Sequence, residues 1–335
     1  MKKYNILSAA AFLSILFFAC NNSKDFYKIA GETQGTTYHM IYEGEHPNLK
    51  KQVDSLLQVF DMSMSTYEPY SVISKVNRGN NVEVDELFTQ MFNKAAEVTE
   101  HSGGAFDITV GPLINAYGFG YGKQETKIDS ALIDSLLQFV GMDKVKIVNN
   151  RLVKEDDRIQ LSGNAISQGQ AVDFIAKFFR EQGIENYMIE IGGELAVKGL
   201  KDGKKWRVGI DKPYEGNDVA GQDLQTVLAI TDKAVATSGN YRKFYVKDGK
   251  KYSHSIDPRT GYPAFQNILS ATIIADDCMT ADAYATACMV SGLEKSKEII
   301  QNNPDLEAYF VYSDEETGEY KVWFTDAVKK MIVKE

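Results

Sequence analysis

The feature that most constrains the fold is a series of short apolar segments in the second half of the chain. Turn residues such as Gly, Asp and Lys separate these segments, a pattern typical of strands joined by hairpins. The predicted strands are Tyr187–Ile191, Glu194–Lys198, Trp206–Ile210, Thr226–Ile230, Ala234–Thr237, Arg242–Val246, Lys251–His254 and Leu269–Ala275. Segments with helical periodicity lie before and after this series, so the sequence predicts a mixed α/β or α+β fold.

The remaining elements follow from the spacing of apolar residues. Helices are predicted where apolar residues recur every three or four positions, over Leu49–Phe60, Asp85–Glu100, Asp129–Val140, 163–183, 278–293 and 294–302. Further strands are predicted over Thr36–Tyr42, Lys144–Asn149, Arg158–Ser162, 306–312 and 319–325. The segment 102–122 is glycine-rich and is predicted to be a loop or a place of close backbone approach. The chain has no repeat and no obvious internal linker, which predicts one domain over residues 33–335.

The N-terminus has the pattern of an export signal. Lys2 and Lys3 precede an apolar run, Ile6–Ala19, which ends at Cys20 and a polar segment. The run suits a signal-peptide core and is short for a membrane span. It resembles a bacterial lipoprotein signal, in which Cys20 carries the lipid; an ordinary secretory signal or an uncleaved anchor are the alternatives. We therefore expect a signal peptide over 1–19, a tether over 20–32, and an extracytoplasmic protein anchored to a bacterial membrane and facing the periplasm.

The composition excludes some classes of protein. Hydrophobic residues make up 44% of the chain and aromatic residues 11%, which argues against global disorder. The formal net charge is −9, whereas a nucleic-acid-binding protein usually carries a basic patch. No nucleic-acid partner is therefore expected.

The segment Cys278–Leu293 is a small-residue helix with a carboxylate and a hydroxyl four positions apart. Residues so spaced share one face of a helix, with about 6 Å between their Cβ atoms. Asp282 and Thr286 could therefore hold a hard cation such as Mg²⁺, which takes oxygen ligands. The alternative is that Asp282 lies near a helix start, where the dipole favours an acid, and that Thr286 only packs.

Two turn-rich segments also contain chemically useful groups. His254, Asp257 and Arg259 lie within eight residues, and they supply a base, an acid and a phosphate-binding guanidinium. The alternative is that this segment is an ordinary β-turn whose polar side chains have no catalytic role. Ala236–Asn240 offers hydroxyls and backbone N–H groups to a phosphate, or else forms a plain turn.

Taken together and in order, nine blocks of residues resemble the ApbE-type flavin transferases, over roughly residues 33–300. The blocks are Gly35–Tyr38, Ser65–Tyr67 with Ser71 and Asn77, Gly104–Asp107, Gly111–Leu113, Gly118–Gly120, Ile191–Glu194, Ala236–Gly239, His254–Gly261 and Ala281–Thr286. The resemblance implies a T-fold-like catalytic domain with mixed or antiparallel sheets flanked by helices.

The resemblance also implies site residues. Asp282 and Thr286 would bind Mg²⁺ together with a backbone carbonyl of the loop 163–169, expected at Ala165. Our candidate for the catalytic base is His254, oriented by Asp257, and activation of the hydroxyl by the metal alone is the alternative. The residues expected to bind FAD are Gln34, Thr36, Tyr67, Ala105, Phe106, Asp107, Gly192, Gly193, Glu194, Thr237, Ser238 and Arg259.

The implied reaction transfers FMN from FAD to a Thr or Ser hydroxyl of a partner protein, a respiratory redox subunit, and releases AMP. The chain departs from the family pattern at Gln34, where Met is common. It also departs in the loop Leu161–Gly169, where Ser162 replaces an Asp and Gln168 replaces a Lys. Those replacements leave the local charge unchanged and do not affect a carbonyl ligand at Ala165.

Two rival functions use the same residues. If water attacks in place of a protein hydroxyl, the enzyme is an FAD pyrophosphatase that releases FMN and AMP. If nothing attacks, the protein is a non-catalytic flavin-binding lipoprotein that stores or delivers FAD.

Overall fold

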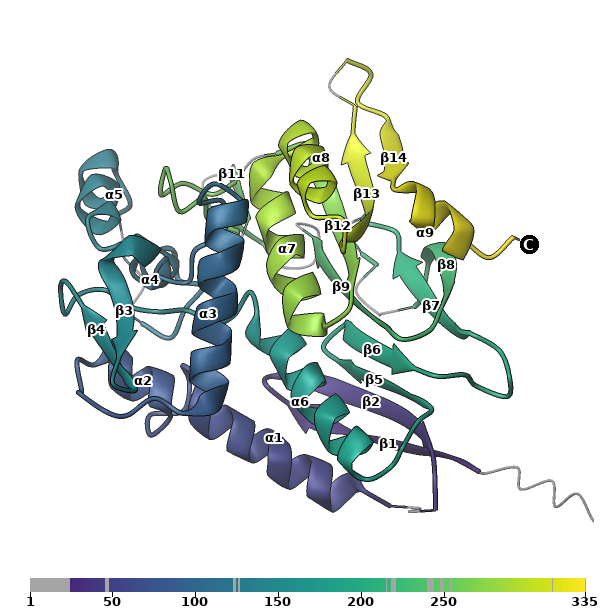
Figure 1. The fold of residues 1–335 in the computed structure, drawn as a ribbon. Helices are drawn as coiled ribbons and strands as arrows, with labels where there is room; N and C mark the ends of the chain where they lie inside the picture. Colours follow the sequence, from purple (N-terminus) through teal and green to yellow (C-terminus); the bar gives the residue numbers. More distant parts are fainter. Residues whose placement is uncertain are drawn as a thin grey trace, which may run out of the picture.

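The structure is a computed structural model, and its ribbon is drawn in Figure 1. It describes residues 25–45, 48–122, 125, 127–214, 216–217, 221–239, 244–247, 250–253, 255–264, 266–314 and 316–334. Within these ranges, every helix is too short or too polar to span a bilayer. The predicted signal peptide and its Cys20 lie outside the described residues.

The centre of the fold is an eight-stranded antiparallel sheet in the described part of the chain, with the order β1-β2-β5-β6-β9-β12-β13-β14. Its strands are β1 (Phe26–Thr33), β2 (Thr36–Glu43), β5 (Tyr187–Ile191), β6 (Glu194–Lys198), β9 (Lys233–Gly239), β12 (Ile268–Ala275), β13 (Glu307–Ser313) and β14 (Tyr320–Phe324). Consecutive side chains of a strand point to opposite faces, so each central strand feeds two separate cores.

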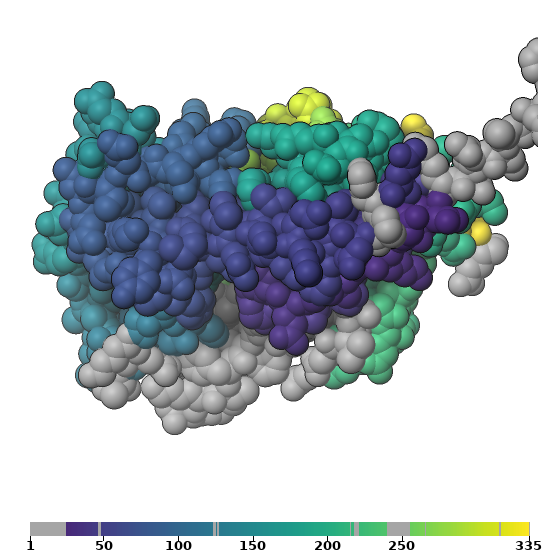
Figure 2. Space-filling model, turned by 90° about the horizontal axis from the view of Figure 1, so that it is seen from below, coloured from purple at the N-terminus to yellow at the C-terminus, as the bar shows by residue number. Residues whose placement is uncertain are grey.

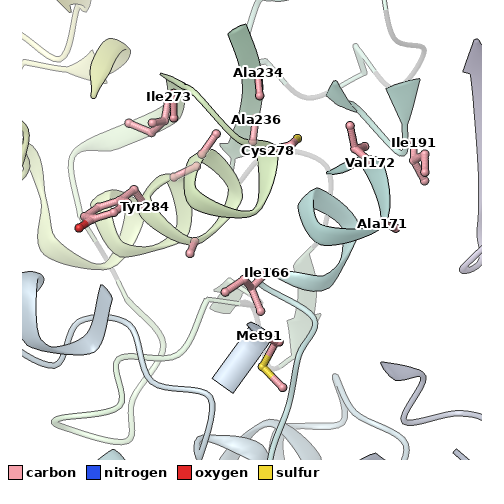
Figure 3. Close-up of a cluster of buried hydrophobic side chains, with 14 of the residues drawn as sticks. Met91, Ile166, Ala171, Val172, Ile191, Ala234, Ala236, Ile273, Cys278 and Tyr284 are labelled. Atoms are coloured by element: carbon pink, nitrogen blue, oxygen red, sulfur yellow. The ribbon is translucent and has the colours of Figure 1, made fainter. Parts of the chain in front are cut away.

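Helices form a layer on one face of this sheet (Figure 1). They are α1 (Lys50–Met64), α3 (Glu86–His101), α6 (Ser167–Glu181), α7 (Cys278–Ser291) and α8 (Leu293–Asn302). Helix α7 contacts β9, β12, α3, α6 and α8. In Figure 3, Ala234 and Ala236 of β9 meet Cys278 of α7, and Val172 of α6 lies close by. The small side chains of α7 let it lie in the middle of the layer, buried on nearly all sides.

The other face of the sheet is covered by a hairpin and a short helix. These are β7 (Trp206–Asp211), β8 (Leu224–Ile230) and α9 (Asp326–Met331). Trp206 and Val208 of β7 pack against Val235 and Ile274 of the sheet. Val235 alternates with Ala234 and Ala236, which face the helix layer, so β9 separates the two cores.

The remaining elements lie beside these layers. They are α2 (Val72–Asn77), α4 (Gly111–Tyr117), α5 (Ser130–Leu137), the 3₁₀ turn Met142–Lys144, β3 (Val145–Val148), β4 (Arg151–Lys154), β10 (Phe244–Lys247) and β11 (Lys250–Ser253). Figure 2 shows the molecule from below, where the N-terminal part of the chain, purple to blue, runs across the surface. A third apolar cluster joins α4 and α5 and includes Leu113, Ile133 and Ile256.

The α+β fold class with antiparallel sheets is confirmed. The elements α2, β4 and α9 were not predicted, and three further segments differ from prediction. Residues 26–33 form β1, although 20–32 was predicted to be a tether. Of its residues only Ile29 is buried, so the edge strand has little hydrophobic pattern and is held by its pairing with β2. The glycine-rich segment contains α4, begun by Pro112 near its N-terminus and ended by Gly118 in the left-handed region.

The strand predicted at 158–162 is absent from the structure. Leu161 makes its backbone hydrogen bonds with the side chain of Asn77, donating to Oδ1 at 2.7 Å and accepting from Nδ2 at 2.8 Å. A side chain thus replaces the neighbouring strand that the apolar pattern had suggested.

Candidate functional site

A cavity of about 980 Å³ opens where the turn between β5 and β6 reaches the end of the sheet. Its wall includes Thr37 and Glu190 of the sheet, Val208 and Gly209 of β7, and Asp282 of α7. The cavity therefore takes residues from both sides of the sheet. Its volume is at the upper end of the range of about 300–1,000 Å³ that is usual for small-molecule sites.

At one end of the cavity lie the carboxylate and the hydroxyl of α7. Asp282 is 5% exposed, and Thr286 lies one turn further along the same helix; both line the cavity. The Thr286 hydroxyl is 3.3 Å from the hydroxyl of Ser238 on β9. The Asp282 Oδ2 atom accepts a hydrogen bond of 3.0 Å from the Gly169 backbone N–H. Asp282 thus also caps the first turn of α6, where the helix dipole favours a negative charge.

Gly169 lets the two helices approach this closely. A Cβ atom at this position would be 2.3 Å from the carbonyl oxygen of Cys278 and 2.8 Å from the Cβ of Asp282. Any larger residue would push α6 away from α7. Ala165 lies in the loop just before α6 and, like Asp282, lines the cavity.

The N-terminus of α7 is held by two further carboxylates. Asp277 accepts hydrogen bonds from the backbone N–H and the hydroxyl of Thr280. Asp173 of α6 accepts from the backbone N–H groups of Cys278 at 2.9 Å and Met279 at 2.8 Å. Burial, reinforced by the nearby charge of Asp277, raises the pKa of Asp173 from its ordinary 3.8 to about 7, against the effect of the two N–H groups. These contacts fix the helix that carries Asp282.

The oxygen donors at this end suit a hard divalent cation. Asp282 supplies a carboxylate, Thr286 and Ser238 supply hydroxyls, and Ala165 is also a lining residue of the cavity. Mg²⁺ prefers one or two carboxylates together with neutral oxygens and water. Among the described residues no cluster of three or more His, Cys, Asp or Glu side chains is arranged for a metal. The donor set therefore fits Mg²⁺ and does not resemble a zinc site.

Three residues of the Gly104–Asp107 block line the cavity: Ala105, Phe106 and Asp107. Ala105 and Phe106 are buried at the wall. Asp107 also lines the cavity, but its carboxylate accepts hydrogen bonds from the backbone N–H groups of Thr109 and Met142. Burial raises the pKa of Asp107, and these hydrogen bonds oppose the rise. Asp107 therefore holds the local loops together.

Tyr67 stands at the opening of the cavity, on the loop after α1, with 65% of its surface exposed. Its loop is tied by the Ser71 hydroxyl, which donates to the backbone carbonyl of Ser65 at 2.7 Å. An exposed aromatic ring on an anchored loop can stack on a planar ligand.

The loop 255–261 contributes Ser255, Ile256 and Pro258 to the wall. Both Asp257 carboxylate oxygens bind Arg259, with Oδ1 accepting from Nε and Oδ2 from Nη2, each at 2.8 Å. This bidentate pair raises the pKa of Arg259 and closes the turn. His254, the predicted base, lies outside the described residues.

The structure thus gathers most of the predicted site residues around one cavity. The predicted residues at its wall are Tyr67, Ala105, Phe106, Asp107, Ala165, Gly192, Gly193, Glu194, Thr237, Ser238, Asp282 and Thr286. Gln34, Thr36, Asp257 and Arg259 are not among the described lining residues. Gln34 lies beside Asp61 of α1, and Thr36 lies against Gly192.

Several polar residues that line the cavity were not predicted from the sequence. His39 and Glu190 lie on neighbouring strands, and Arg207 lies on β7. Strand alternation was the signal that could have found them, because His39 and Arg207 are polar residues at the non-core positions of their strands. Ser162 and Gln168, the two departures from the family pattern, also line the cavity.

The ApbE family model matches residues 34–310. The chain belongs to the ApbE family. It is 36% identical to the FAD:protein FMN transferase of Vibrio cholerae serotype O1, over 94% of this chain and 96% of that protein. It is 32% identical to the FAD:protein FMN transferase of Escherichia coli K12, over 92% and 89% of the two chains. The prediction of an ApbE-type transferase is therefore confirmed.

Solved structures agree with the sequence relatives. The flavin transferase ApbE from Vibrio cholerae superposes with a TM-score of 0.81 at 32% identity, covering 92% of this chain and 99% of that one. The apo form of the Pseudomonas stutzeri flavinyl transferase ApbE gives a TM-score of 0.80 at 29% identity, covering 92% and 97%.

Proposed function

We propose that this ApbE-family protein is a Mg²⁺-dependent FAD:protein FMN transferase that links FMN to a Thr or Ser hydroxyl of a partner protein and releases AMP. The observation that carries the proposal is the buried Asp282 carboxylate and, one turn further along α7, the Thr286 hydroxyl, both at the wall of a cavity large enough for a dinucleotide. The names of the relatives support FAD as the donor and a protein as the acceptor.

Asp282, Thr286 and the Ala165 carbonyl would hold the Mg²⁺, with Ser238 supporting the Thr286 hydroxyl at 3.3 Å. When bound, the ion would neutralise pyrophosphate charge and polarise phosphorus as a Lewis acid. The protein's own part is to keep these oxygens fixed before substrate arrives. The buried caps of α7 and the close contact at Gly169 provide that rigidity.

The transfer balances as a substitution at phosphorus. The acceptor hydroxyl oxygen forms a bond to the phosphorus on the FMN side, and the bond from that phosphorus to the bridging oxygen breaks. AMP leaves with the electron pair, and the hydroxyl proton passes to a base, for which His254 is our candidate. Asp257, with both oxygens on Arg259, would keep the loop after His254 in place.

The remaining wall would bind the nucleotide by shape. Tyr67 offers an exposed aromatic ring to the flavin or the adenine, and Gly192 and Gly193 let the ligand approach the backbone. Phe106 and Thr237 complete the wall. Among the described residues that line the cavity, acidic groups outnumber basic ones, so the negatively charged pyrophosphate needs a counter-charge. A bound divalent cation would supply it.

We further propose that Cys20 carries a lipid and anchors the enzyme at a bacterial membrane, facing the periplasm, where it would modify respiratory redox subunits. The charged start, the apolar run and the Cys20 boundary support this location. Metabolic labelling with a fatty acid, compared between the natural chain and Cys20→Ala, tests it; equal labelling would contradict it.

The decisive test incubates the purified protein with FAD, Mg²⁺ and a flavin-acceptor domain. We expect the acceptor to gain one FMN, seen by mass spectrometry and by in-gel flavin fluorescence, with AMP released in equal amount. Free FMN without labelled acceptor would identify a pyrophosphatase. Tight FAD binding without turnover under any divalent metal would identify a flavin-binding protein.

A further inference from the structure

His39 and Glu190 form a hydrogen-bonded pair at the cavity wall. They are directly opposite each other on β2 and β5, and their side chains therefore share one face of the sheet. His39 Nδ1 and Glu190 Oε2 are 2.8 Å apart, with side-chain exposures of 64% and 23%. Both residues line the cavity.

The second oxygen of Glu190 holds the double-glycine turn between β5 and β6. Glu190 Oε1 accepts a hydrogen bond of 2.7 Å from the Gly193 N–H. The Gly192 N–H donates to the Thr37 carbonyl at 3.0 Å. Both amides of the turn are therefore bonded within the protein. The turn serves a ligand through the close approach of its backbone, because its N–H groups already have acceptors.

The two glycines give this turn little rigidity of their own, so hydrogen bonds to neighbouring groups help to hold it. Gly192 has φ of 66° and Gly193 of 110°, values that glycine adopts with ease and also leaves with ease. A Cβ at Gly192 would meet Gln168 Nε2 at 2.6 Å, whereas one at Gly193 would meet nothing within 4 Å. Gly192 thus packs against the protein, while Gly193 faces open space at the cavity wall.

We propose that Glu190, itself oriented by His39, is a positioning residue that fixes the Gly192–Gly193 turn as a binding surface for the flavin nucleotide. The proposal rests on the proposed function. Exposed ion pairs contribute only about 0.2–1 kcal/mol to stability, so the pair has little effect on the global fold. The charge-assisted bond to the Gly193 N–H is stronger and acts on the cavity wall alone.

The test compares Glu190→Ala with Glu190→Gln in the full-length protein. Flavin fluorescence gives the dissociation constant for FAD, and steady-state transfer gives KM and kcat. We expect Glu190→Ala to weaken FAD binding and raise KM about fivefold, equal to about 1 kcal/mol, with kcat within about twofold. Glu190→Gln should stay within about twofold of the natural protein, because its amide oxygen still accepts from the Gly193 N–H.

Glu83→Ala is the matched control, because Glu83 forms an exposed pair with Arg151 away from the cavity. It should leave FAD binding unchanged, and thermal unfolding of all three variants checks the fold. Equal effects of the Ala and Gln changes at Glu190, or unchanged FAD binding in Glu190→Ala, would overturn the positioning role. Failure of the unmodified protein to bind FAD would instead refute the proposed function and this proposal with it.

Discussion

Two parts of the cavity wall, the α7 region and the double-glycine turn, are built in different ways. At the α7 end, Asp282 is 5% exposed and is bonded to the start of another helix, while Asp173 and Asp277 cap α7 itself. At the double-glycine turn, half-exposed side chains on two strands hold a backbone with two positive φ values. The α7 region, where a charge must be placed accurately, is held by carboxylates that cap helix ends. The double-glycine turn is held by the Glu190 carboxylate and the Thr37 carbonyl.

Removing the carboxylate at the α7 end should have the largest effect. Asp282→Ala should lower metal-dependent FMN transfer at least about a hundredfold, the scale of a lost charge-stabilising group. Asp282→Asn should lower it similarly while keeping an oxygen acceptor for the Gly169 N–H. Rates measured across a Mg²⁺ titration, with thermal unfolding as control, check this. Activity of either variant within about twofold of the natural protein would refute the ligand role.

The Thr286 hydroxyl should have a smaller effect than the Asp282 carboxylate, because a neutral ligand carries no charge. Thr286→Val keeps the shape and should lower transfer about tenfold, equal to about 1.4 kcal/mol. Thr286→Ser keeps the hydroxyl and should stay within about threefold. The Mg²⁺ concentration at half-maximal rate should rise for Val and not for Ser. Equal rates for the two variants would mean that Thr286 only packs.

The double-glycine turn should be sensitive to sterics and not to metal. Gly192→Ala should destabilise the fold by about 1–2 kcal/mol through its left-handed backbone, with an added clash against Gln168. Shortening Gln168 to Ala in the same chain should recover part of that loss in urea unfolding. In Gly193→Ala nothing lies within 4 Å of the new Cβ. Its free energy of unfolding should therefore fall only by the cost of the positive φ. If the double variant is no more stable than Gly192→Ala, the contact with Gln168 does not contribute to the destabilisation.

The buried cap at Asp173 should make stability depend on pH. Its pKa is 3.8 in an ordinary setting and about 7 here. Between these values the folded protein keeps a proton that the unfolded chain has lost, so the unfolding free energy falls as pH rises, by at most about 1.4 kcal/mol per pH unit. The unfolding free energy, measured with urea from pH 5 to 8, should fall less steeply with pH in Asp173→Asn than in the natural protein.

Asp156 provides the control for that experiment. It is an exposed carboxylate whose pKa Arg158 lowers to about 2, so it is ionised in both states throughout the tested range. Asp156→Asn should leave the slope unchanged. A slope that is the same in Asp173→Asn and the natural protein would show that another group titrates.

The sequence predicted the elements whose own pattern is strong. Strands such as Tyr187–Ile191 and the helix with Asp282 and Thr286 follow from periodicity, and the ordered blocks indicated which of them meet. The apolar pattern was weak in segments that are held by contacts with residues elsewhere in the chain. Strand β1 has one buried residue, and Leu161 is held by the Asn77 side chain in place of a strand. Neither contact can be deduced from local spacing.

The site was predictable in its chemistry and less so in its geometry. Asp282, Thr286, Phe106 and the double-glycine turn were expected, and they line one cavity. The pairing of His39 with Glu190 was not expected, because it depends on the register between two strands about 150 residues apart in the chain. The Asp257 oxygens bind Arg259, a pairing that the sequence did not indicate, and the predicted contact of Asp257 with His254 stays a prediction because His254 lies outside the described residues.

The strand order of the sheet has a consequence for how the protein matures. Strand β2 finds its partner β5 only after the chain between them has been made, and the cavity draws on residues from Thr37 to Thr286. Pairings between such distant segments form slowly, because loop closure must come first. The nucleotide site is therefore complete only when nearly the whole chain has folded. FAD, binding only the finished protein, would pull the folding equilibrium toward the active enzyme and protect it from proteolysis.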